Sequence, residues 1–371
     1  MGSGLSAFDR LEEGWVWRSG DANPGQAGGS RCAVASDGTL VCTYMSSSRL
    51  GVNDMCPMIA WSDDGGVTWR DHRLVWPALK ERWSIAVNVS SDGDGGLYLF
   101  GIRWPIDEPG EPFWNSETGG LKQNDLVWSR SHDGGETWSD LRVIPMPFPG
   151  TAEAPGAMCV TRDGLWLCPY SPYPDFDGKA QVDRGRVIVM VSDDGGERWS
   201  HADMLRFPEP RTGSAEAWVV ELADGRLLGA GWKMDLDDSR DYENPFALSR
   251  DGLIWEGTRS TGTLGQSVGL AATADGRVLM TYNQRKRGER GVWLALARPD
   301  EEGFGIEADE VVWRAQEATK GDSSGDHGEW TDFAFGEPAV TVLEDGILLI
   351  VFWVGQPGGS GVRYLRLRLA A

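Results

Sequence analysis

The sequence has few of the residues that build metal centres, disulfide frameworks or membrane spans. Only four histidines are scattered along 371 residues, and the five cysteines include no CxxC pair. Neither a zinc pattern nor a disulfide framework is therefore indicated, and we expect buried free thiols and no cofactor. No run approaches the roughly twenty apolar residues of a membrane span. No charged-then-apolar segment opens the chain. We expect a soluble protein, either cytoplasmic or secreted with its signal removed.

Positive charge is also scarce. Lys and Arg number 35 against 56 Asp and Glu, which gives a net charge of -21. A field of this sign repels phosphate groups. Nucleic acids and anionic membranes are therefore excluded as expected partners.

What the chain has in abundance is glycine and tryptophan, with 50 and 19 copies. Some of them fall in a repeated stretch that reads SDDGGVTW at 62–69, with related copies at 131–138, 192–199 and, shortened, 249–255. The Asp-Gly pair supplies the positive φ of a tight hairpin, and the closing Trp packs beneath it. Four copies at intervals of roughly sixty residues indicate a repeat architecture.

A second repeat runs out of phase with the first. It consists of an apolar strand, an Asp-Gly turn and another apolar strand, with turns near 37–38, 92–96, 163–164, 224–225, 275–276 and 345–346. Combining the two repeats gives six four-stranded antiparallel units, which predicts an all-β, six-bladed β-propeller. An extra strand at 13–20 is expected to complete the last blade and close the ring.

We therefore expect a single domain over 1–371. It would comprise a tail at 1–12 and blades at approximately 28–78, 80–145, 152–206, 213–262, 264–318 and 334–371. The long loops, at 45–55, 104–124, 171–183, 233–244, 283–290 and 316–335, all fall on one face of such a ring. Long loops gathered at one mouth of a rigid scaffold are typical of a binding site.

Carboxylates occur at matched positions beside this mouth. Glu216 lies nine residues before Gly225, and Glu337 lies nine before Gly346. Equal register in equivalent strands predicts that both side chains reach the axial funnel. Gln266 lies at nearly this position in blade five, and Glu153 precedes the inner strand of blade three. Acids beside apolar strands cost stability unless they are paired or functional, although loop capping is an alternative.

Cations accompany these acids. Arg31 opens the inner strand of blade one, and Arg49 and Asp54 lie in the loop that follows. In blade five, Arg285 or Arg290 is expected to reach the mouth. Guanidinium groups at one mouth suit a polar or carboxylated ligand, and a salt-bridge network between blades is the alternative.

With these motifs the chain resembles the sialidase (neuraminidase) superfamily, whose propellers carry Asp-box (BNR) repeats. In that family an arginine triad binds the sugar carboxylate, a Glu assists a Tyr nucleophile, and an Asp is the acid/base. Arg49 and Asp54 resemble the blade-one arginine and the acid/base. Glu216 resembles the assisting Glu. Arg31 resembles the first triad arginine, displaced by about three residues.

Two positions depart from the family pattern. Trp232 and Lys233 stand where the second triad arginine would be, and Glu337 stands where the nucleophilic tyrosine would begin the last inner strand. The tyrosine serves sialidases because an anionic nucleophile is repelled by the sugar carboxylate. A glutamate there suggests a substrate without that carboxylate.

These residues predict a sialidase-like exo-glycosidase acting on a carbohydrate, as in the related exo-arabinanases. Glu216 and Glu337 are the candidate catalytic carboxylates and Asp54 the candidate acid/base. The candidate substrate-binding residues are Arg31, Arg49, Lys233, Arg285, Arg290, Trp232, Glu153 and Gln266. The alternatives are a sialidase proper, a polysaccharide lyase using Arg31, Arg49, Lys233 and Tyr282, and a non-catalytic glycan-binding propeller.

Overall fold

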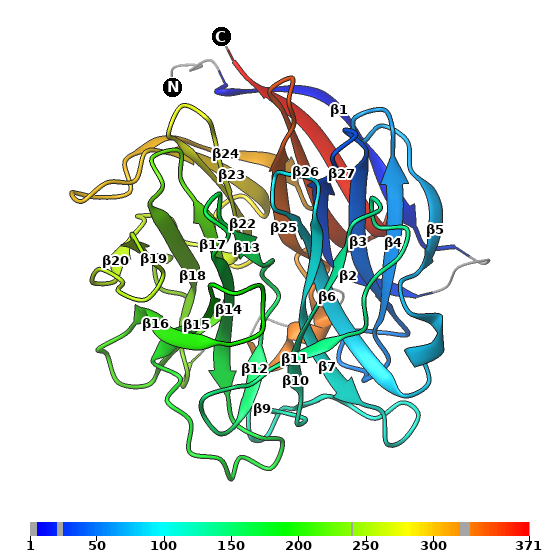
Figure 1. Cartoon of the computed structure of the whole chain (residues 1–371), viewed down its shortest axis with the longest axis vertical. Coiled ribbons are helices and arrows are strands. Elements are labelled where there is room, and N and C mark those ends of the chain that lie inside the picture. Colours follow the sequence, from blue (N-terminus) through cyan, green and yellow to red (C-terminus); the bar gives the residue numbers. More distant parts are fainter. Residues whose placement is uncertain (1–5, 21–24, 239, 320–326, 371) are drawn as a thin grey trace.

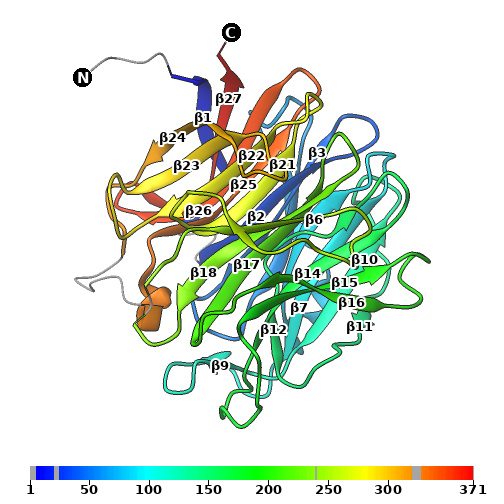
Figure 2. The same ribbon diagram turned by 90° about the vertical axis from the view of Figure 1, so that its left-hand side faces the viewer.

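The chain folds into six antiparallel sheets that stand around a central axis as the blades of a propeller (Figures 1 and 2). The structure is a computed structural model that describes residues 6–20, 25–238, 240–319 and 327–370. Each blade has four strands that follow one another from the axis outward. The predicted fold is therefore confirmed. Within the described residues, no helix is long and apolar enough to cross a membrane.

The strand bounds follow blade by blade, from the axis outward. The first blade contains β2 (Gln26–Val34), β3 (Leu40–Ser47), β4 (Cys56–Ser62) and β5 (Arg70–Leu74). The second contains β6 (Trp83–Ser91), β7 (Leu97–Pro105), β10 (Asp125–Ser131) and β11 (Arg142–Ile144). The third contains β12 (Thr151–Glu153) with β13 (Cys159–Val160), then β14 (Trp166–Tyr173), β15 (Arg186–Ser192) and β16 (Ser200–Arg206). The fourth contains β17 (Thr212–Glu221), β18 (Leu227–Asp235), β19 (Pro245–Ser249) and β20 (Arg259–Ser260). The fifth contains β21 (Gln266–Ala272), β22 (Val278–Gln284), β23 (Gly291–Ala297) and β24 (Ile306–Arg314). The sixth contains β25 (Phe335–Val342), β26 (Ile347–Gln356), β27 (Gly359–Leu369) and β1 (Phe8–Arg18). The connections add a hairpin of β8 (Trp114–Asn115) and β9 (Gly120–Leu121), and the 3-10 turns η1 (Pro77–Leu79) and η2 (His327–Asp332).

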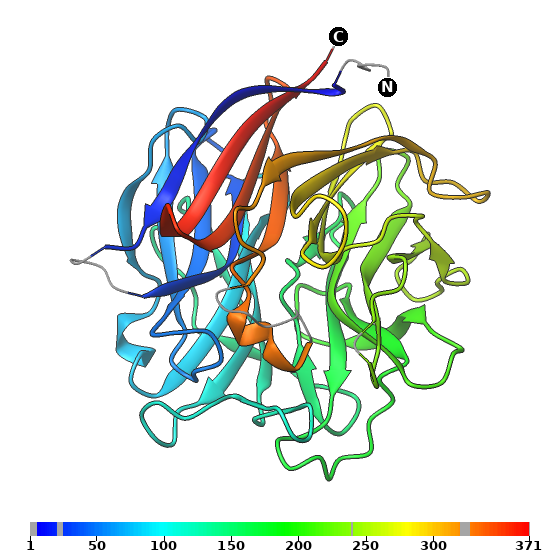
Figure 3. The same ribbon diagram turned by 180° about the vertical axis from the view of Figure 1, so that it is seen from behind.

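The first strand of the chain closes the ring. β1 runs antiparallel to β27 from the pair Phe8–Leu369 to the pair Arg18–Gly361, so both ends of the chain share one blade (Figure 3). This strand begins at Phe8, five residues before the predicted start. The first half of β1 is mostly charged rather than apolar, and one of its charged residues, Glu12, forms an ion pair with Arg366 of β27. Charge pairing, and not an apolar pattern, extends the strand.

The apolar core lies between the blades. In β26, eight consecutive residues from Ile347 to Val354 are buried, since neighbouring blades cover both faces of the strand. Such continuous runs are expected of strands buried on both sides. All five cysteines are free thiols, and Cys32 lies directly opposite Cys42 across the first hairpin.

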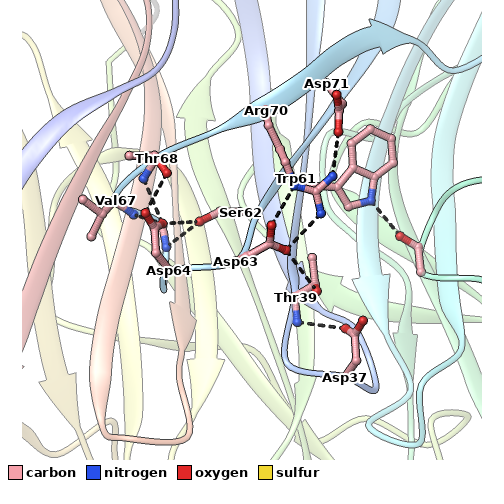
Figure 4. Close-up of polar contacts among 12 residues, drawn as sticks. Asp37, Thr39, Trp61, Ser62, Asp63, Asp64, Val67, Thr68, Arg70 and Asp71 are labelled. Carbon is pink, nitrogen blue, oxygen red and sulfur yellow. Dashed lines mark hydrogen bonds and ion pairs between the residues drawn. The ribbon is translucent and has the colours of Figure 1, made fainter.

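The repeated turn is held by its own polar side chains (Figure 4). In the first copy, Asp64 accepts hydrogen bonds from the backbone N–H groups of Val67 and Thr68 at 3.1 and 2.9 Å. Ser62 accepts one from the N–H of Gly66, and the Trp69 indole N–H donates to the Gly66 carbonyl. These bonds satisfy the turn internally, as the sequence pattern predicts. These turns therefore have a structural role, and the candidate functional site lies at the opposite face of the ring.

The inner strand of the third blade is interrupted. β12 and β13 both pair with β14, and the residues between them, 154–158, are irregular. Pro155 lies in this gap and has no N–H to donate to a ladder. Its carbonyl instead accepts a hydrogen bond from Arg31 at 3.1 Å. β13 is consequently only two residues long.

Candidate active site

A cavity of about 650 Å³ opens where the inner strands meet the long loops. Its wall includes residues of the inner strands of several blades and of the loops that follow β3, β7, β14 and β18. These are loops that the sequence places at one mouth of the ring. The volume lies within the range of small-molecule sites.

Four inner strands carry a β-bulge at the same point. The residue in the left-handed region is Gly29 in β2, Glu216 in β17, Ser267 in β21 and Glu337 in β25, with φ of 45°, 52°, 56° and 51°. Each lies nine residues before the glycine of its hairpin turn. A bulge re-aims a side chain, and left-handed backbone at a non-glycine residue is a strain found mostly at functional sites. The two matched glutamates therefore occupy equivalent, strained positions on the cavity wall.

In blade five, the equivalent position is Ser267 and not Gln266. Gln266 is buried, donates to Asp241 and accepts from Arg285, and it does not appear on the cavity wall. The nine-residue spacing, applied strictly, identifies Ser267. The prediction for this blade was displaced by one residue, because a bulge changes the face to which each side chain points.

Glu337 is oriented by two hydrogen bonds. Its Oε2 accepts from the backbone N–H of Gly29 at 2.7 Å and from the indole N–H of Trp353 at 2.8 Å. A Cβ at position 29 would overlap the end of the Met45 side chain, which would have to move. The first and the last blade thus each donate one hydrogen bond to this carboxylate.

Glu216 carries a buried oxygen, Oε2, with no hydrogen-bond partner among the described residues. Burial raises the pKa of Glu216 to about 7, and the neighbouring carboxylate of Glu337 adds to the rise. A hydrogen bond from Ser267 and the nearby guanidinium group of Arg285 act in the opposite direction. Near pH 7 this side chain exists in both protonation states, as a general acid/base requires.

Glu153 lies next to Glu216 on the cavity wall. Its Oε2 accepts a hydrogen bond from the backbone N–H of Glu216 at 2.9 Å. Burial, followed by the charge of Glu216, raises the pKa of Glu153 well above its usual value, which favours the protonated form of this carboxyl group. Glu153, Glu216 and Glu337 together form what we call the glutamate cluster.

Two arginines lie close to the glutamate cluster. Arg31 is buried and donates to the carbonyls of Ser30, Glu337 and Pro155 at 2.7–3.1 Å. It lies outside the set of residues that line the cavity. Arg285 does line it, and donates to the carbonyl of Phe335. Burial lowers the pKa of Arg285 to about 10, which leaves it cationic at pH 7.

Two other predicted residues line the cavity. Arg49 is exposed on the loop after β3, and Trp232 is buried near the end of β18. The Trp232 indole N–H donates to Asp241 at 3.0 Å, which fixes the orientation of the ring.

Besides Arg31 and Gln266, three predicted residues are not among those that line the cavity. The carboxylate of Asp54 accepts from the backbone N–H of Ser48, and so closes its own loop. Lys233 forms an ion pair with Glu209 at 3.0 Å. The backbone carbonyl of Arg290, which directly precedes β23, accepts a hydrogen bond from the N–H of Ala315. Their predicted roles in catalysis or binding stay predictions.

The cavity also contains residues that the sequence reasoning missed. Tyr173 ends β14, and the guanidinium group of Arg184 lies 3.7 Å from the centre of its ring. Burial raises the pKa of Tyr173 to about 12, so its hydroxyl group stays protonated. Trp353, within the apolar run of β26, is the third. The predicted loop over 171–183 was the available signal for the first two, since it ends one residue before Arg184.

Comparison with known proteins gives one curated relative. A sialidase from Bacteroides fragilis (strain YCH46) is 26% identical over 229 residues, which is 57% of this chain and 39% of the relative. The match thus spans about two-fifths of the relative's length. No family model matches the chain.

Solved structures match over nearly the whole chain. A protein of unknown function from Dyadobacter fermentans covers 99% of this chain and all of its own, with a TM-score of 0.77 and 17% identity. A Hadza microbial sialidase covers 96% of this chain and 68% of its own, with a TM-score of 0.70 and 18% identity. The chain has the sialidase fold. An α-L-arabinofuranosidase from Fusarium graminearum shares this sialidase-type propeller at a TM-score of 0.63 and 16% identity, over 97% of this chain and 98% of its own.

Proposed function

We propose that this protein is an exo-acting glycoside hydrolase that removes a terminal sugar from a glycan or glycoside. One observation carries the proposal: Glu216 and Glu337 lie at equivalent bulges on the wall of one cavity. Hydrolysis of a glycosidic bond needs one carboxylic acid and one carboxylate on either side of that bond. The likeness of the fold to sialidases and to an arabinofuranosidase supports the same class of reaction.

The environments of the two glutamates suggest separate roles. Glu216, with its pKa near 7, donates a proton to the leaving oxygen. Glu337, held by Gly29 and Trp353, attacks the anomeric carbon or activates a water molecule. Glu153 is a positioning residue, because it binds the backbone N–H of Glu216. Asp54 gives way to Glu216 as the candidate acid, since Glu216 lines the cavity.

A sialidase activity is the second candidate. The Bacteroides relative is named a sialidase, and Arg49 and Arg285 offer positive charge on the cavity wall. The glutamate at position 337, which stands where sialidases use tyrosine, favours a substrate that lacks the carboxylate. The lyase alternative loses support, because the hydroxyl group of Tyr282 is bonded to Asp309 at 2.8 Å.

A panel of 4-methylumbelliferyl glycosides, including an α-L-arabinofuranoside and a sialoside, tests the activity and separates these substrates. On the sugar that is cleaved, leaving groups of different acidity then test the two roles. Glu216→Gln should slow hydrolysis of an alkyl or weakly acidic aryl glycoside by about 10²–10⁴-fold. It should slow a 2,4-dinitrophenyl glycoside far less, since that leaving group needs no proton.

Glu337→Gln should slow hydrolysis of all these substrates to a similar extent. Glu108→Gln, at an exposed position, is the matched control. Equal activity of the wild type and both glutamate variants on every cleaved substrate would refute the proposed catalytic pair.

A further inference from the structure

One flank of the cavity is apolar, in contrast to the glutamate cluster. It is built by Leu50 and Val52 after β3, by residues from β7 to β9, and by a tryptophan of η2. The residues from β7 to β9 that line it are Ile102, Trp104, Phe113, Trp114 and Leu121, and the η2 residue is Trp330. Three segments far apart in sequence therefore form one apolar surface.

Four rings form the centre of this flank, and we call them the aromatic shelf: Trp104, Phe113, Trp114 and Trp330. The ring centres of Trp104 and Phe113 are 5.0 Å apart, and that of Phe113 is 5.6 Å from Trp330. Trp114 meets Trp330 edge to face at 5.9 Å. Trp104 and Phe113 are buried, whereas Trp114 and Trp330 are half-buried. Part of the shelf thus stays open to a ligand.

The hairpin that carries Trp114 is held by hydrogen bonds to the loop after β14. In the β8–β9 hairpin, Asn115 and Thr118 both donate to the carbonyl of Phe176, at 2.9 and 2.8 Å. The N–H of Leu121 donates to the carbonyl of Pro174. A preformed apolar surface binds a flat ligand at a small cost in conformational entropy.

The shelf also has a polar atom with no partner. Trp104 is 2% exposed and lines the cavity, and its indole N–H has no acceptor among the described residues. A buried donor without an acceptor costs stability, so Trp104 is held in this position at an energetic cost.

We propose that the aromatic shelf is a binding subsite for the planar, uncharged aromatic aglycone of a phenolic glycoside. That the ligand is an aglycone rests on the proposed function. An aromatic ring suits the indole faces of Trp114 and Trp330. A neutral group suits a protein of net charge -21 with glutamates nearby. In the reaction the bond between the anomeric carbon and the phenol oxygen breaks, water supplies the hydroxyl group to the carbon, and the phenol takes up the proton.

Binding of the free aglycone tests this subsite without any hydrolysis. The probe is 4-methylumbelliferone, measured by equilibrium dialysis. We expect Trp114→Ala and Trp330→Ala each to weaken its binding about tenfold, since loss of one aromatic contact removes up to about 1.5 kcal/mol. Trp114→Phe and Trp330→Phe should retain most of the affinity. They keep the test decisive if an alanine variant fails to fold.

Two further variants separate the subsite from the catalytic proposal. Trp15→Ala, which removes a half-buried tryptophan of β1, should leave the binding unchanged. Glu216→Gln should bind the probe as the wild type does while losing hydrolysis. If no glycoside is cleaved and the shelf variants still lose the probe, the proposed function fails and the aromatic subsite stands. If wild type and shelf variants bind the probe equally, the subsite is refuted, whatever the activity.

Discussion

The repeated turns and the cavity place carboxyl groups in opposite environments, at two ends of the blades. At the turn end, a hydrogen bond from the Arg198 side chain and one from its backbone N–H lower the pKa of Asp194 to about 2. At the cavity end, burial raises the pKa of Glu216 to about 7. The turn carboxylate is partly exposed to water and surrounded by donors, whereas the cavity carboxylate is buried beside other carboxylates. The turn therefore keeps its carboxylate ionised as a hydrogen-bond acceptor, whereas the cavity holds a carboxyl group that can exchange a proton near pH 7.

The largest expected effect is on catalysis at the cavity end. Glu337→Gln should lower kcat/KM on the preferred glycoside by about 10³-fold or more, because it removes the carboxylate that acts at the anomeric carbon. The amide is nearly isosteric, so the circular dichroism spectrum should be unchanged. A folded variant with wild-type kcat/KM would contradict the role of Glu337.

A second prediction concerns the backbone that holds Glu337. Gly29→Ala places a Cβ against Met45 in a left-handed conformation, with φ of 45°. We expect it to destabilise the fold by about 3 kcal/mol, through strain and overpacking together. Gly38→Ala is the matched control. It has φ of 85° but open space around it, and should cost only about 1–2 kcal/mol. Urea denaturation of the two variants measures the difference, and equal losses would show that Met45 moves freely.

A third prediction uses the pH dependence of stability. A carboxyl group whose pKa is raised in the folded state stabilises the fold below its unfolded pKa, and this stabilisation is lost as the pH rises through about 7. Between pH 5.5 and 8.5, the wild type should therefore lose about 2 kcal/mol relative to Glu216→Gln, at 1.36 kcal/mol per pH unit up to pH 7. Glu108→Gln should follow the wild type. Parallel curves for wild type and Glu216→Gln would mean that Glu216 ionises normally.

The smallest expected effect is at the turn end. Asp133 accepts hydrogen bonds from Ser131 and from the backbone N–H of Thr137, at 2.7 and 2.9 Å. Asp133→Ala should lower the free energy of unfolding by about 1 kcal/mol and leave kcat/KM unchanged. His132→Ala, at the exposed neighbouring position, should alter neither quantity. A loss of activity in Asp133→Ala would break the division between the two ends.

The fold could be predicted because its signals repeat. Six copies of one strand pair fix the blade count, and equal spacing before the turn glycines placed Glu216 and Glu337 on one wall. Single features were harder. Gln266, predicted for blade five, lies one residue before Ser267, and only the exact nine-residue spacing, not the strand pattern, separates the two. The positions of Asp54 and Arg290 depend on loop geometry, for which a sequence offers no period.

The closure of the ring has a consequence for how the molecule is made. Phe8 leaves the ribosome hundreds of residues before Leu369, its partner across the last pair of strands. β1 has no partner strand until β27 has been synthesised. Contacts so distant along the chain are slow to form and arrive late in folding. We therefore expect the pairing of β1 with β27 to be among the last contacts to form.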